Sequence, residues 1–357
     1  MECVMQKVYK SLRLTIRLIV ILAFVPLFFS QSIHAQAIKY AQAGMPFLKL
    51  DVSPRNAAMG GAQIGVVGNP LDMFANPAGL ATIEGFEVAS SVTNWIVDTR
   101  LYGTGAAYNA GNLGVFGVGL IWMDYGTIER TVPVTGAGAD PELRNKGYIS
   151  DGTFSVQEYA LGLSYARNIS SQFAIGGQVK YALQNLGDVV IYDEFADETI
   201  DRTNEVSNIV LDFGTIYYTG FKDLRFGMSF RNFSDQSDYF DQRFELPLNF
   251  TFGLAMDVLT LFSGEGGLAG SNNLTVAFDW VHPRDYAERQ HLGLEYVFND
   301  MLFLRGGYRF NYDEQGLTAG LGVNFEVSNI GLNVNYSYDD FGKYFNAVNR
   351  IAFGVAF

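Results

Sequence analysis

Large apolar residues and small or polar residues alternate without a break along residues 248–258, LNFTFGLAMDV. Every even position from Leu248 to Val258 is large and apolar, and every odd position from Asn249 to Asp257 is small or polar. Successive side chains of an extended strand point to opposite faces, so this segment predicts a strand with one apolar and one polar face. A strand of this length can cross a bilayer if it is tilted.

The same alternation recurs from residue 86 to residue 357 and predicts about 14 strands of the kind found in membrane barrels. The expected strands cover residues 86–94, 100–110, 114–124, 157–167, 173–184, 206–218, 224–233, 247–258, 273–280, 289–298, 302–311, 317–325, 330–338 and 349–357. Many apolar rows end in a ring that prefers the headgroup level of a membrane, namely Trp122, Tyr165, Tyr181, Trp280, Tyr296 and Tyr338. An aromatic-rich β-sandwich core is the alternative, but so many repeats favour rows that face lipid.

The links between the expected strands alternate in length. Short links follow the second, fourth, sixth, tenth and twelfth strands, and the longest links cover residues 125–156 and 185–205. Outer-membrane barrels have short periplasmic turns and longer outer loops, so the chain predicts a closed antiparallel transmembrane β-barrel. Two links do not fit, because residues 259–272 are long for a periplasmic turn and residues 312–316 are short for an outer loop. The terminal Phe357 ends an alternating strand and resembles the signal that the barrel-assembly machinery of Gram-negative bacteria recognises.

Composition and charge agree with an all-β membrane protein. Of the 357 residues, 15% are aromatic, only 17% are charged and 39 are Gly. Few charges with many aromatic and Gly residues suit a sheet that faces lipid, and they suit a cytosolic enzyme poorly. The net charge of −13 argues against a nucleic-acid partner, because no basic patch offsets the acidic groups.

The first 37 residues have the pattern of a secretory signal peptide. Basic residues between positions 7 and 17 precede an apolar run over residues 18–29, and Ala35-Gln36-Ala37 supplies a cleavage site. The apolar run is too short for a transmembrane helix. Cleavage would remove Cys3, the only cysteine, so we expect no disulfide or thiol chemistry in the mature chain. A secreted chain with strands suited to lipid predicts the outer membrane of a Gram-negative bacterium.

Residues 38–85 lack the alternation and form a separate N-terminal segment ahead of the predicted barrel of residues 86–357. The run SPRNAAMGGA at residues 53–62 predicts a short helical turn that ends at Gly60-Gly61, and Asn76-Pro77-Ala78-Gly79 predicts a turn. This segment is too small to bury a core of its own. We therefore expect it to pack inside or beneath the barrel.

Charged residues also occur at positions expected to face the lumen. They are Glu158, Lys180, Asp212, Arg225, Arg231, Asp257, Asp279, Glu295, Arg305 and Arg309. A network of opposite charges and water that fills a polar interior is the favoured interpretation. A charged path for a ligand is the alternative.

Signals for catalysis or for a bound metal or cofactor are weak. Only His282 and His291 follow the expected signal peptide, and His282 with Asp285 is the one imaginable His/Asp pair. The acidic run over residues 188–205 lacks the spacing and the Gly of a calcium loop, so a solvated outer loop bridged loosely to lipopolysaccharide is expected instead. We therefore predict a protein that is not an enzyme and has no metal and no cofactor.

Two N-terminal motifs resemble the signature of a known family. SPRNAAMGGA at residues 53–62, followed by NPAGL at residues 76–80, is similar to the N-terminal signature of the PorV/PorQ family within the FadL-like outer-membrane barrels. The resemblance implies a barrel of 14 strands whose N-terminal segment forms a hatch in the lumen. It implies hatch positions with a structural role at Arg55, Met59, Gly60, Gly61, Asn76, Pro77 and Gly79.

The resemblance leaves two functions open. A component of the type IX secretion system would bind cargo C-terminal domains or the attachment complex through its outer loops, and its partners would also include outer-membrane lipids and lipopolysaccharide. A FadL-like passive transporter of hydrophobic molecules would instead need an apolar pocket and a break in the wall. The polar, Gly-rich lumen disfavours such a pocket. Gly176-Gly177 and Gly306-Gly307 could still kink a strand.

Overall fold

The computed structural model describes residues 43–134, 141–193, 198–239, 242–261 and 272–357. The expected signal peptide lies outside these residues. No helix in the described part of the chain is both long enough and apolar enough to cross a membrane.

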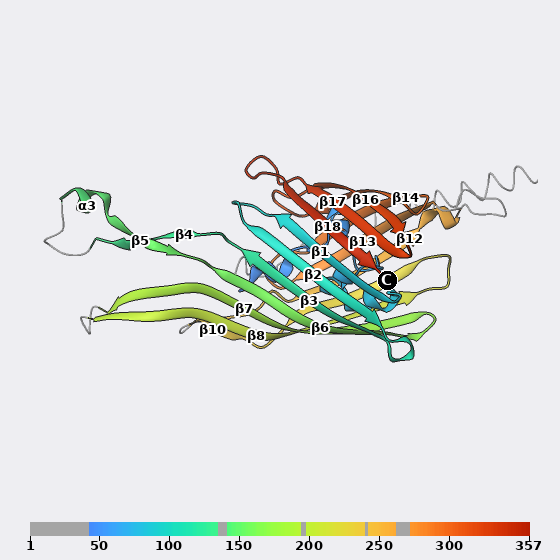
Figure 1. The fold of residues 1–357 in the computed structure, drawn as a ribbon, viewed down its shortest axis with the longest axis horizontal. Coiled ribbons are helices and arrows are strands. Elements are labelled where there is room, and N and C mark those ends of the chain that lie inside the picture. Colours follow the sequence, from blue (N-terminus) through green and yellow to red (C-terminus); the bar gives the residue numbers. More distant parts are fainter. Residues whose placement is uncertain (1–42, 135–140, 194–197, 240–241, 262–271) are drawn as a thin grey trace, which may run out of the picture. The chain divides into compact units, whose positions relative to one another are not determined.

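Fourteen antiparallel strands close into a barrel (Figure 1). They are β1 (Phe86–Asn94), β2 (Arg100–Asn109), β3 (Val115–Asp124), β6 (Gln157–Ser170), β7 (Phe173–Asp193), β8 (Glu198–Tyr218), β9 (Arg225–Phe233), β12 (Asn249–Asp257), β13 (Asn273–Pro283), β14 (Arg289–Phe298), β15 (Leu302–Phe310), β16 (Leu317–Val327), β17 (Ile330–Asp339) and β18 (Val348–Ala356). β1 pairs with β18 to close the ring, with Glu87 opposite Ala356 and Asn94 opposite Asn349. Each strand of the barrel overlaps one strand that the alternation predicted, so the predicted fold is confirmed.

Two of the predicted loops are wrong, because they form strands. The expected loop at residues 185–205 extends β7 and β8 into a long hairpin, which pairs from Asp188 opposite Thr203 to Asp193 opposite Glu198. Val189, Val190 and Ile191 are β-branched and favour extended backbone even without alternation. Within residues 125–156, a second hairpin contains three elements: β4 (Ile128–Pro133), α3 (Pro141–Lys146) and β5 (Tyr148–Phe154). A short third hairpin joins β9 to β12 and consists of β10 (Ser237–Tyr239) and β11 (Gln242–Phe244).

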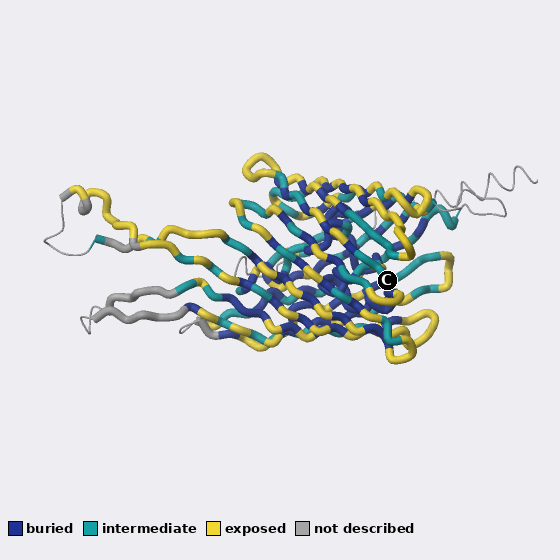
Figure 2. Tube along the Cα trace, in the orientation of Figure 1, coloured by how far each residue is buried: buried dark blue, intermediate teal, exposed yellow. Residues whose placement is uncertain are grey.

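Burial alternates along the wall as the sequence predicted (Figure 2). On β12 the odd positions from Asn249 to Asp257 are buried inside the barrel. Phe252, an even position, has 47% of its surface exposed. Large apolar side chains that remain exposed over a whole barrel have no protein layer to cover them, and lipid is the environment that suits them.

Aromatic pairs mark both ends of the barrel. We call the end with Phe86 and Phe357 the short-turn end, and the opposite end, which carries the hairpins, the long-loop end. At the short-turn end the rings of Phe86 and Phe357 stack at 6.0 Å. At the long-loop end Tyr102 and Trp122 stack at 5.1 Å. Rings at two levels agree with the expected aromatic belts of a membrane barrel.

Residues 43–85, which we call the hatch segment, fill the interior of the barrel. They contain η2 (Pro46–Lys49), α2 (Pro54–Ala58), η3 (Pro70–Phe74) and η4 (Pro77–Thr82). α2 packs against β15 to β18, η3 packs against β1 to β3, and η4 packs against β6, β7 and β8. The fully buried side chains Phe47, Met73 and Leu80 belong to one apolar core with wall residues such as Leu101 and Ile216. The apolar core of the protein is therefore the contact between hatch segment and wall.

Candidate functional site

A tight turn positions the first hatch motif. Helix α2 begins at Pro54, ends at Ala58 and is capped by Met59. Gly60 and Gly61 follow with φ of +67° and +82°, a left-handed backbone that other residues rarely adopt. The Gly60 amide donates to Thr318 Oγ1 at 2.9 Å, and Thr318 Oγ1 donates to the Ala58 carbonyl at 2.8 Å. One wall hydroxyl therefore bonds both sides of the turn.

Glycines of the wall make room for the hatch backbone. A Cβ atom on Gly293 would lie 2.6 Å from the Met59 carbonyl oxygen, and one on Gly307 would lie 2.7 Å from the same oxygen. A Cβ atom on Gly176 would collide with the backbone of Pro77 and Ala78. Real Cβ contacts are not this short, so side chains at these positions would displace the hatch segment.

These glycines do not kink the wall. Gly176-Gly177 on β7 and Gly306-Gly307 on β15 keep an unbroken register with both neighbouring strands. In each pair one glycine faces the hatch segment, and a Cβ atom on the other would have no neighbour closer than 3.7 Å. The break in the wall that these pairs could have made is therefore not present at either pair, and one glycine of each pair allows close approach of the hatch segment instead.

Arg55 holds α2 to the wall through a charged triad. Its Nη2 lies 2.7 Å from Oε1 of Glu295 on β14, and its Nη1 donates to the Val67 carbonyl at 2.8 Å. Arg305 on β15 donates to Glu295 Oε2 at 2.6 Å and to Asn335 Oδ1 at 2.7 Å. Burial opposes the charge of Arg55, but attraction to Glu295 raises the pKa of its guanidinium above the ordinary value. A carboxylate between two guanidiniums satisfies a charge that would be costly to bury alone.

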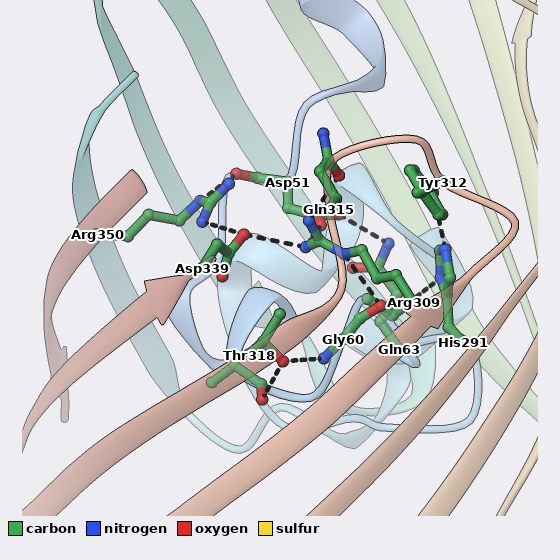
Figure 3. A network of polar contacts seen from close by, with 12 residues as sticks. Asp51, Gly60, Gln63, His291, Arg309, Tyr312, Gln315, Thr318, Asp339 and Arg350 are labelled. Carbon is green, nitrogen blue, oxygen red and sulfur yellow. Dashed lines mark hydrogen bonds and ion pairs between the residues drawn. The ribbon is translucent and has the colours of Figure 1, made fainter. Parts of the chain in front are cut away.

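A second network joins the hatch segment to the last strands (Figure 3). Arg309 on β15 lies 3.0 Å from Asp51 Oδ2 and 3.2 Å from Oδ2 of Asp339 on β17. Arg350 on β18 lies 2.7 Å from Asp339 Oδ2 and donates to the Asp51 carbonyl at 3.2 Å. Burial alone would raise the pKa of the Asp51 carboxyl, but attraction to Arg309 and Arg350 outweighs burial and lowers this pKa. Asp51 is therefore ionised near neutral pH, and it ties the start of the hatch segment to the wall.

His291 belongs to the same region (Figure 3). Its Nδ1 lies 3.1 Å from the Gly61 carbonyl, and its Nε2 lies 2.8 Å from the Tyr312 hydroxyl. Both ring nitrogens are occupied by these two contacts, one with the hatch segment and one with the turn after β15. His291 thus has a positioning role between hatch segment and wall.

A third group surrounds a buried ion pair on the other side of the barrel. Lys180 Nζ on β7 lies 2.7 Å from Asp212 Oδ2 on β8, and it donates to Asn232 Oδ1 at 2.8 Å. Asn232 has φ of +62° and forms a bulge in β9, where its amide donates to Asp212 Oδ1 at 2.7 Å. The Asn232 side chain also reaches the Leu48 carbonyl at 3.4 Å.

Side chains of the wall form hydrogen bonds directly with the backbone of the hatch segment, a carboxylate as acceptor and a guanidinium as donor. Asp279 Oδ2 on β13 accepts from the amides of Gln63 and Ile64 at 2.7 and 3.0 Å. Arg231 on β9 donates to the Phe74 carbonyl at 2.9 Å. Asn76 caps η4, whose first residue is Pro77, and its Nδ2 donates to the Ile64 carbonyl at 2.9 Å. Gly79 follows within the same turn.

The remaining predicted lumen residues lie apart from these groups. Glu158 accepts from the Tyr125 hydroxyl at 2.6 Å near the long-loop end. Asp257 accepts from the amides of Leu259 and Leu274, both at 3.0 Å, and so caps the link after β12. Arg225 lies 3.3 Å from Asp223 at the short-turn end. None of these three contacts the hatch segment through a described hydrogen bond or ion pair.

Four residues of these polar networks were not predicted from the sequence. Arg350 has the same parity as Ala352 and Gly354, so the alternation could have placed it inside. Asp339 has inward parity but lies one residue beyond the predicted strand 330–338. Asn232 and Asp51 carry no signal of this kind, because one forms a bulge and the other lies in an irregular segment.

The imagined His/Asp pair does not form. Asp285 lies 2.5 Å from Lys49 Nζ, and His282 lies 3.5 Å from Glu288. In the described residues, no three His, Cys, Asp or Glu side chains gather closely enough to hold a metal ion.

The sequence of residues 147–352 matches the family described as type IX secretion system membrane protein PorP/SprF. The match covers more than half of the chain. The chain belongs to this family. The predicted association with type IX secretion is confirmed at this level, and a FadL-like barrel in the Gram-negative outer membrane accords with it. The match does not include residues 53–62 and 76–80, so the PorV/PorQ resemblance of these motifs stays a prediction. Comparison with curated protein sequences gives no match.

Solved structures with the same fold include two toluene transporters and a FadL homologue. The Ralstonia pickettii toluene transporter TbuX is 15% identical, with a TM-score of 0.55 over 87% of this chain and 99% of that chain. The Pseudomonas putida toluene transporter TodX is 13% identical, with a TM-score of 0.53 over 85% of this chain and 96% of that chain. A Pseudomonas aeruginosa FadL homologue is 10% identical, with a TM-score of 0.50 over 85% of this chain and 96% of that chain. At these identities the similarity concerns the fold alone.

Proposed function

We propose that this PorP/SprF barrel serves type IX secretion by docking proteins at its long-loop end, and that it is not an open conduit. The carrying observation is the hatch segment, which lies across the lumen and is held there by charged groups from several strands. Arg55 bonds Glu295, Asp51 bonds Arg309, and the amides of Gln63 and Ile64 bond Asp279. Breaking one buried pair of this kind costs about 3–5 kcal/mol. A hatch segment held in this way suits a permanent structural element.

The docking elements we propose are the two long hairpins. The extension of β7 and β8 continues beyond Asn185, the last residue at which β7 pairs with β6. The β4–β5 hairpin forms a separate two-stranded sheet. A two-stranded hairpin has unpaired backbone groups along its edges, and an incoming strand can bond to them. The partners would be cargo C-terminal domains or the attachment complex, as the PorV/PorQ resemblance of residues 53–62 and 76–80 implies.

Shortening one hairpin at a time tests the docking role. Joining Asn185 to Glu205 by a two-residue turn removes the β7–β8 extension and leaves the wall strands in register. We expect the shortened barrel to reach the outer membrane and to lose the secretion subunits or cargo domains that copurify with the unaltered barrel. A second variant that joins Gly126 to Ser155 removes only the β4–β5 hairpin and tests the other proposed docking element in the same way. Undiminished copurification and secretion with both variants would contradict docking by the hairpins.

Passive transport of hydrophobic molecules is the second candidate, and one feature of the wall favours it. The bulge at Asn232 interrupts the register between β8 and β9 beside the buried Lys180 and Asp212. FadL-like proteins share this fold. Fatty acids that copurify with the barrel in the absence of any secretion subunit or cargo domain would support transport over docking.

A further inference from the structure

The wall of the barrel separates into two ribbons at the long-loop end. β6 and β7 pair as far as Gln157 opposite Asn185, and beyond this pair β7 bonds only β8. β5 leads into β6 and, together with β4, forms a two-stranded sheet of its own. Figure 1 shows the β4–β5 hairpin and the β7–β8 extension diverging from each other. The edges of β5 and β7 that would continue the β6–β7 ladder are therefore unpaired within the described residues.

A bulge bends each ribbon close to the point of separation. Between Asn185 and Asp188, two residues of β7 stand opposite one residue of β8, and Gly187 in this bulge has φ of +86°. The β4–β5 ladder shifts its register in the same way, and Gly152 at this shift has φ of +84°. A bulge bends its strand and increases the local twist, and a glycine adopts the left-handed backbone without strain. The divergence of the two ribbons therefore has a cause in the sequence of each.

Phe154 and Gly187 meet at the base of the gap between the ribbons. A Cβ atom on Gly187 would lie 2.9 Å from the Phe154 ring, so the ring packs directly on this glycine. The Gly187 amide also donates to Asn185 Oδ1 at 2.8 Å, which holds the bulge in place. We call the gap that opens beyond this contact, between β5 and residues 188–193 of β7, the edge slot.

Two strand edges across from each other suit one further strand. Neighbouring strands lie about 4.8 Å apart, so a strand between two edges needs a gap of about 10 Å. Such a strand would bond to both ribbons through its backbone and would make the sheet continuous again. A lipid or a single side chain offers no row of N–H and C=O groups at strand spacing. The ligand that the two edges select is therefore an extended polypeptide.

The sequence on one side of the edge slot favours a basic ligand. Residues 188–193 of β7 and 198–205 of β8 contain one basic residue, Arg202, and five acidic residues, which are Asp188, Asp193, Glu198, Asp201 and Glu205. Opposite charges on neighbouring strands stabilise their pairing, and like charges oppose it. The same acidic residues disfavour pairing with the β7–β8 hairpin of a second copy of this chain.

We propose that the edge slot receives one extended strand with basic side chains from a partner protein, and that this strand bonds to β5 on one side and to β7 on the other. The inference rests on the proposed docking role of the hairpins, and it adds the mode of binding and the chemistry of the partner. A strand that docked on a single edge would leave the other ribbon unchanged, whereas insertion engages both ribbons at once.

Calorimetric titration of the full barrel in detergent micelles tests the mode of binding. The probe is the peptide N-acetyl-Lys-Thr-Lys-Val-Lys-Thr-Lys-amide. Alternate N–H groups of a strand point to opposite edges, so N-methylation of the Thr and Val residues blocks one edge of the peptide, and N-methylation of the inner Lys residues blocks the other. We expect one molecule of the unmodified peptide to bind per barrel. Either methylated peptide should bind at least about 100-fold more weakly, as for loss of two or more hydrogen bonds.

A peptide with Glu in place of every Lys tests the charge preference and should also bind at least about 100-fold more weakly, because its charges repel those of the β7–β8 extension. Undiminished binding of either methylated peptide, equal binding of the Glu peptide, or no binding of the unmodified peptide would each overturn the proposal.

Hydrogen exchange of the full barrel places the peptide. The bound peptide should slow exchange of backbone amides both in β5 and in residues 188–193 of β7, because N–H groups on both edges gain partners. Slower exchange in one ribbon alone, or in neither, would overturn the edge slot. This measurement needs no variant and so does not depend on whether an altered barrel folds.

Shortened barrels supply the second test of location. The barrel that joins Asn185 to Glu205 and the barrel that joins Gly126 to Ser155 each lack one edge, so each should bind the peptide at least about 100-fold more weakly. A barrel that joins Gln236 to Glu245 lacks only the β10–β11 hairpin and is the matched control, which should bind like the unaltered barrel. The heat-dependent gel shift of a folded barrel checks each variant. Undiminished binding to either of the first two barrels would overturn the edge slot.

Failure of the edge slot and failure of the docking role give different results. If secretion subunits are lost from the shortened barrels but one methylated peptide still binds the full barrel, the hairpins dock partners and the edge slot is wrong. If secretion subunits stay with both shortened barrels while the peptide behaves as expected, the edge slot is supported and the proposed docking of those subunits is wrong.

Discussion

Arg350 on β18 lies 2.7 Å from Asp339 on β17, and each of these side chains is only 1% exposed. Asp339 also accepts from Arg309 at 3.2 Å, and Arg350 bonds the Asp51 carbonyl. The last two strands of the barrel and the start of the hatch segment therefore share one charged network. Because none of these charges can turn to water, the loss of one partner leaves the others uncompensated.

Arg350→Met should destabilise the barrel by about 3 kcal/mol, the lower end of the range for a broken buried pair, because Arg309 still neutralises part of the charge on Asp339. Urea unfolding in detergent micelles, followed by Trp fluorescence, measures the change. Arg225→Met is the matched control, because its partner Asp223 is 41% exposed, and exposed pairs are worth about 1 kcal/mol or less. Equal losses in the two variants would contradict the buried network.

Gly307→Ala should displace the hatch segment while the wall stays closed. A Cβ atom at this position would press on the Met59 carbonyl oxygen at 2.7 Å, whereas a Cβ atom on the neighbouring Gly306 would have no atom nearer than 3.9 Å. Overpacking of this kind costs about 1–3 kcal/mol. Limited proteolysis of the folded barrel reports on the hatch segment, which should be cut faster in Gly307→Ala than in the unaltered protein.

Gly306→Ala supplies the comparison, because it adds the same methyl group to the same strand on the other face. Its cutting rate should equal that of the unaltered protein. Slow cutting in both variants would show that the hatch segment does not depend on close approach at Gly307.

The wall could be predicted from the sequence because the face to which a strand residue points depends only on whether its position is odd or even. Asn249 and Phe252 differ in burial for that reason alone, and the same rule would have placed Arg350 inside. The β7–β8 hairpin was missed, since the run Val189-Val190-Ile191 does not alternate with polar residues and so gives no period of two.

The contacts between hatch segment and wall could not be predicted from the sequence. Asp51 and Arg309 are 258 positions apart, and only the path of the hatch segment brings them to 3.0 Å. Lys180 and Asp212 were both expected to face inward, but their pairing depends on the register of β7 and β8 and on the bulge at Asn232. Alternation gives a direction for each side chain, and it carries no information about which inward residues meet.

Asp72 makes the stability of the hatch segment depend on pH. This residue is 2% exposed, caps η3 by accepting from the Asn69 amide at 3.0 Å, and has a pKa that burial raises from 3.8 to about 6. A carboxyl whose folded pKa is raised contributes stability that is full below pH 4 and is lost as the pH rises through 6.

Asp72→Asn keeps an acceptor for the Asn69 amide and removes the charge. The variant should match the unaltered protein at pH 4 and should be more stable by about 2–3 kcal/mol at pH 8. Urea unfolding at both pH values measures this difference. Asp235→Asn, in an exposed loop after β9, is the matched control that makes the same chemical change outside the hatch segment. If Asp72→Asn raised the free energy of unfolding as much at pH 4 as at pH 8, the raised pKa of Asp72 would not be its cause.

Phe252→Arg tests the environment outside the wall. Phe252 lies in the middle of β12, is 47% exposed, and stacks on the Trp280 ring at 6.0 Å. An Arg that faces lipid near the middle of the membrane costs about 2–4 kcal/mol, because its charge leaves water without gaining a partner. Folding into lipid bilayers at increasing urea concentration measures this loss, and Phe252→Leu should be close to neutral because it keeps an apolar surface. In detergent micelles water reaches the charge more easily, so the penalty for Arg should be smaller there. Equal penalties in bilayers and micelles would mean that position 252 does not contact hydrocarbon, and the lipid-facing assignment of the even positions on β12 would then fall.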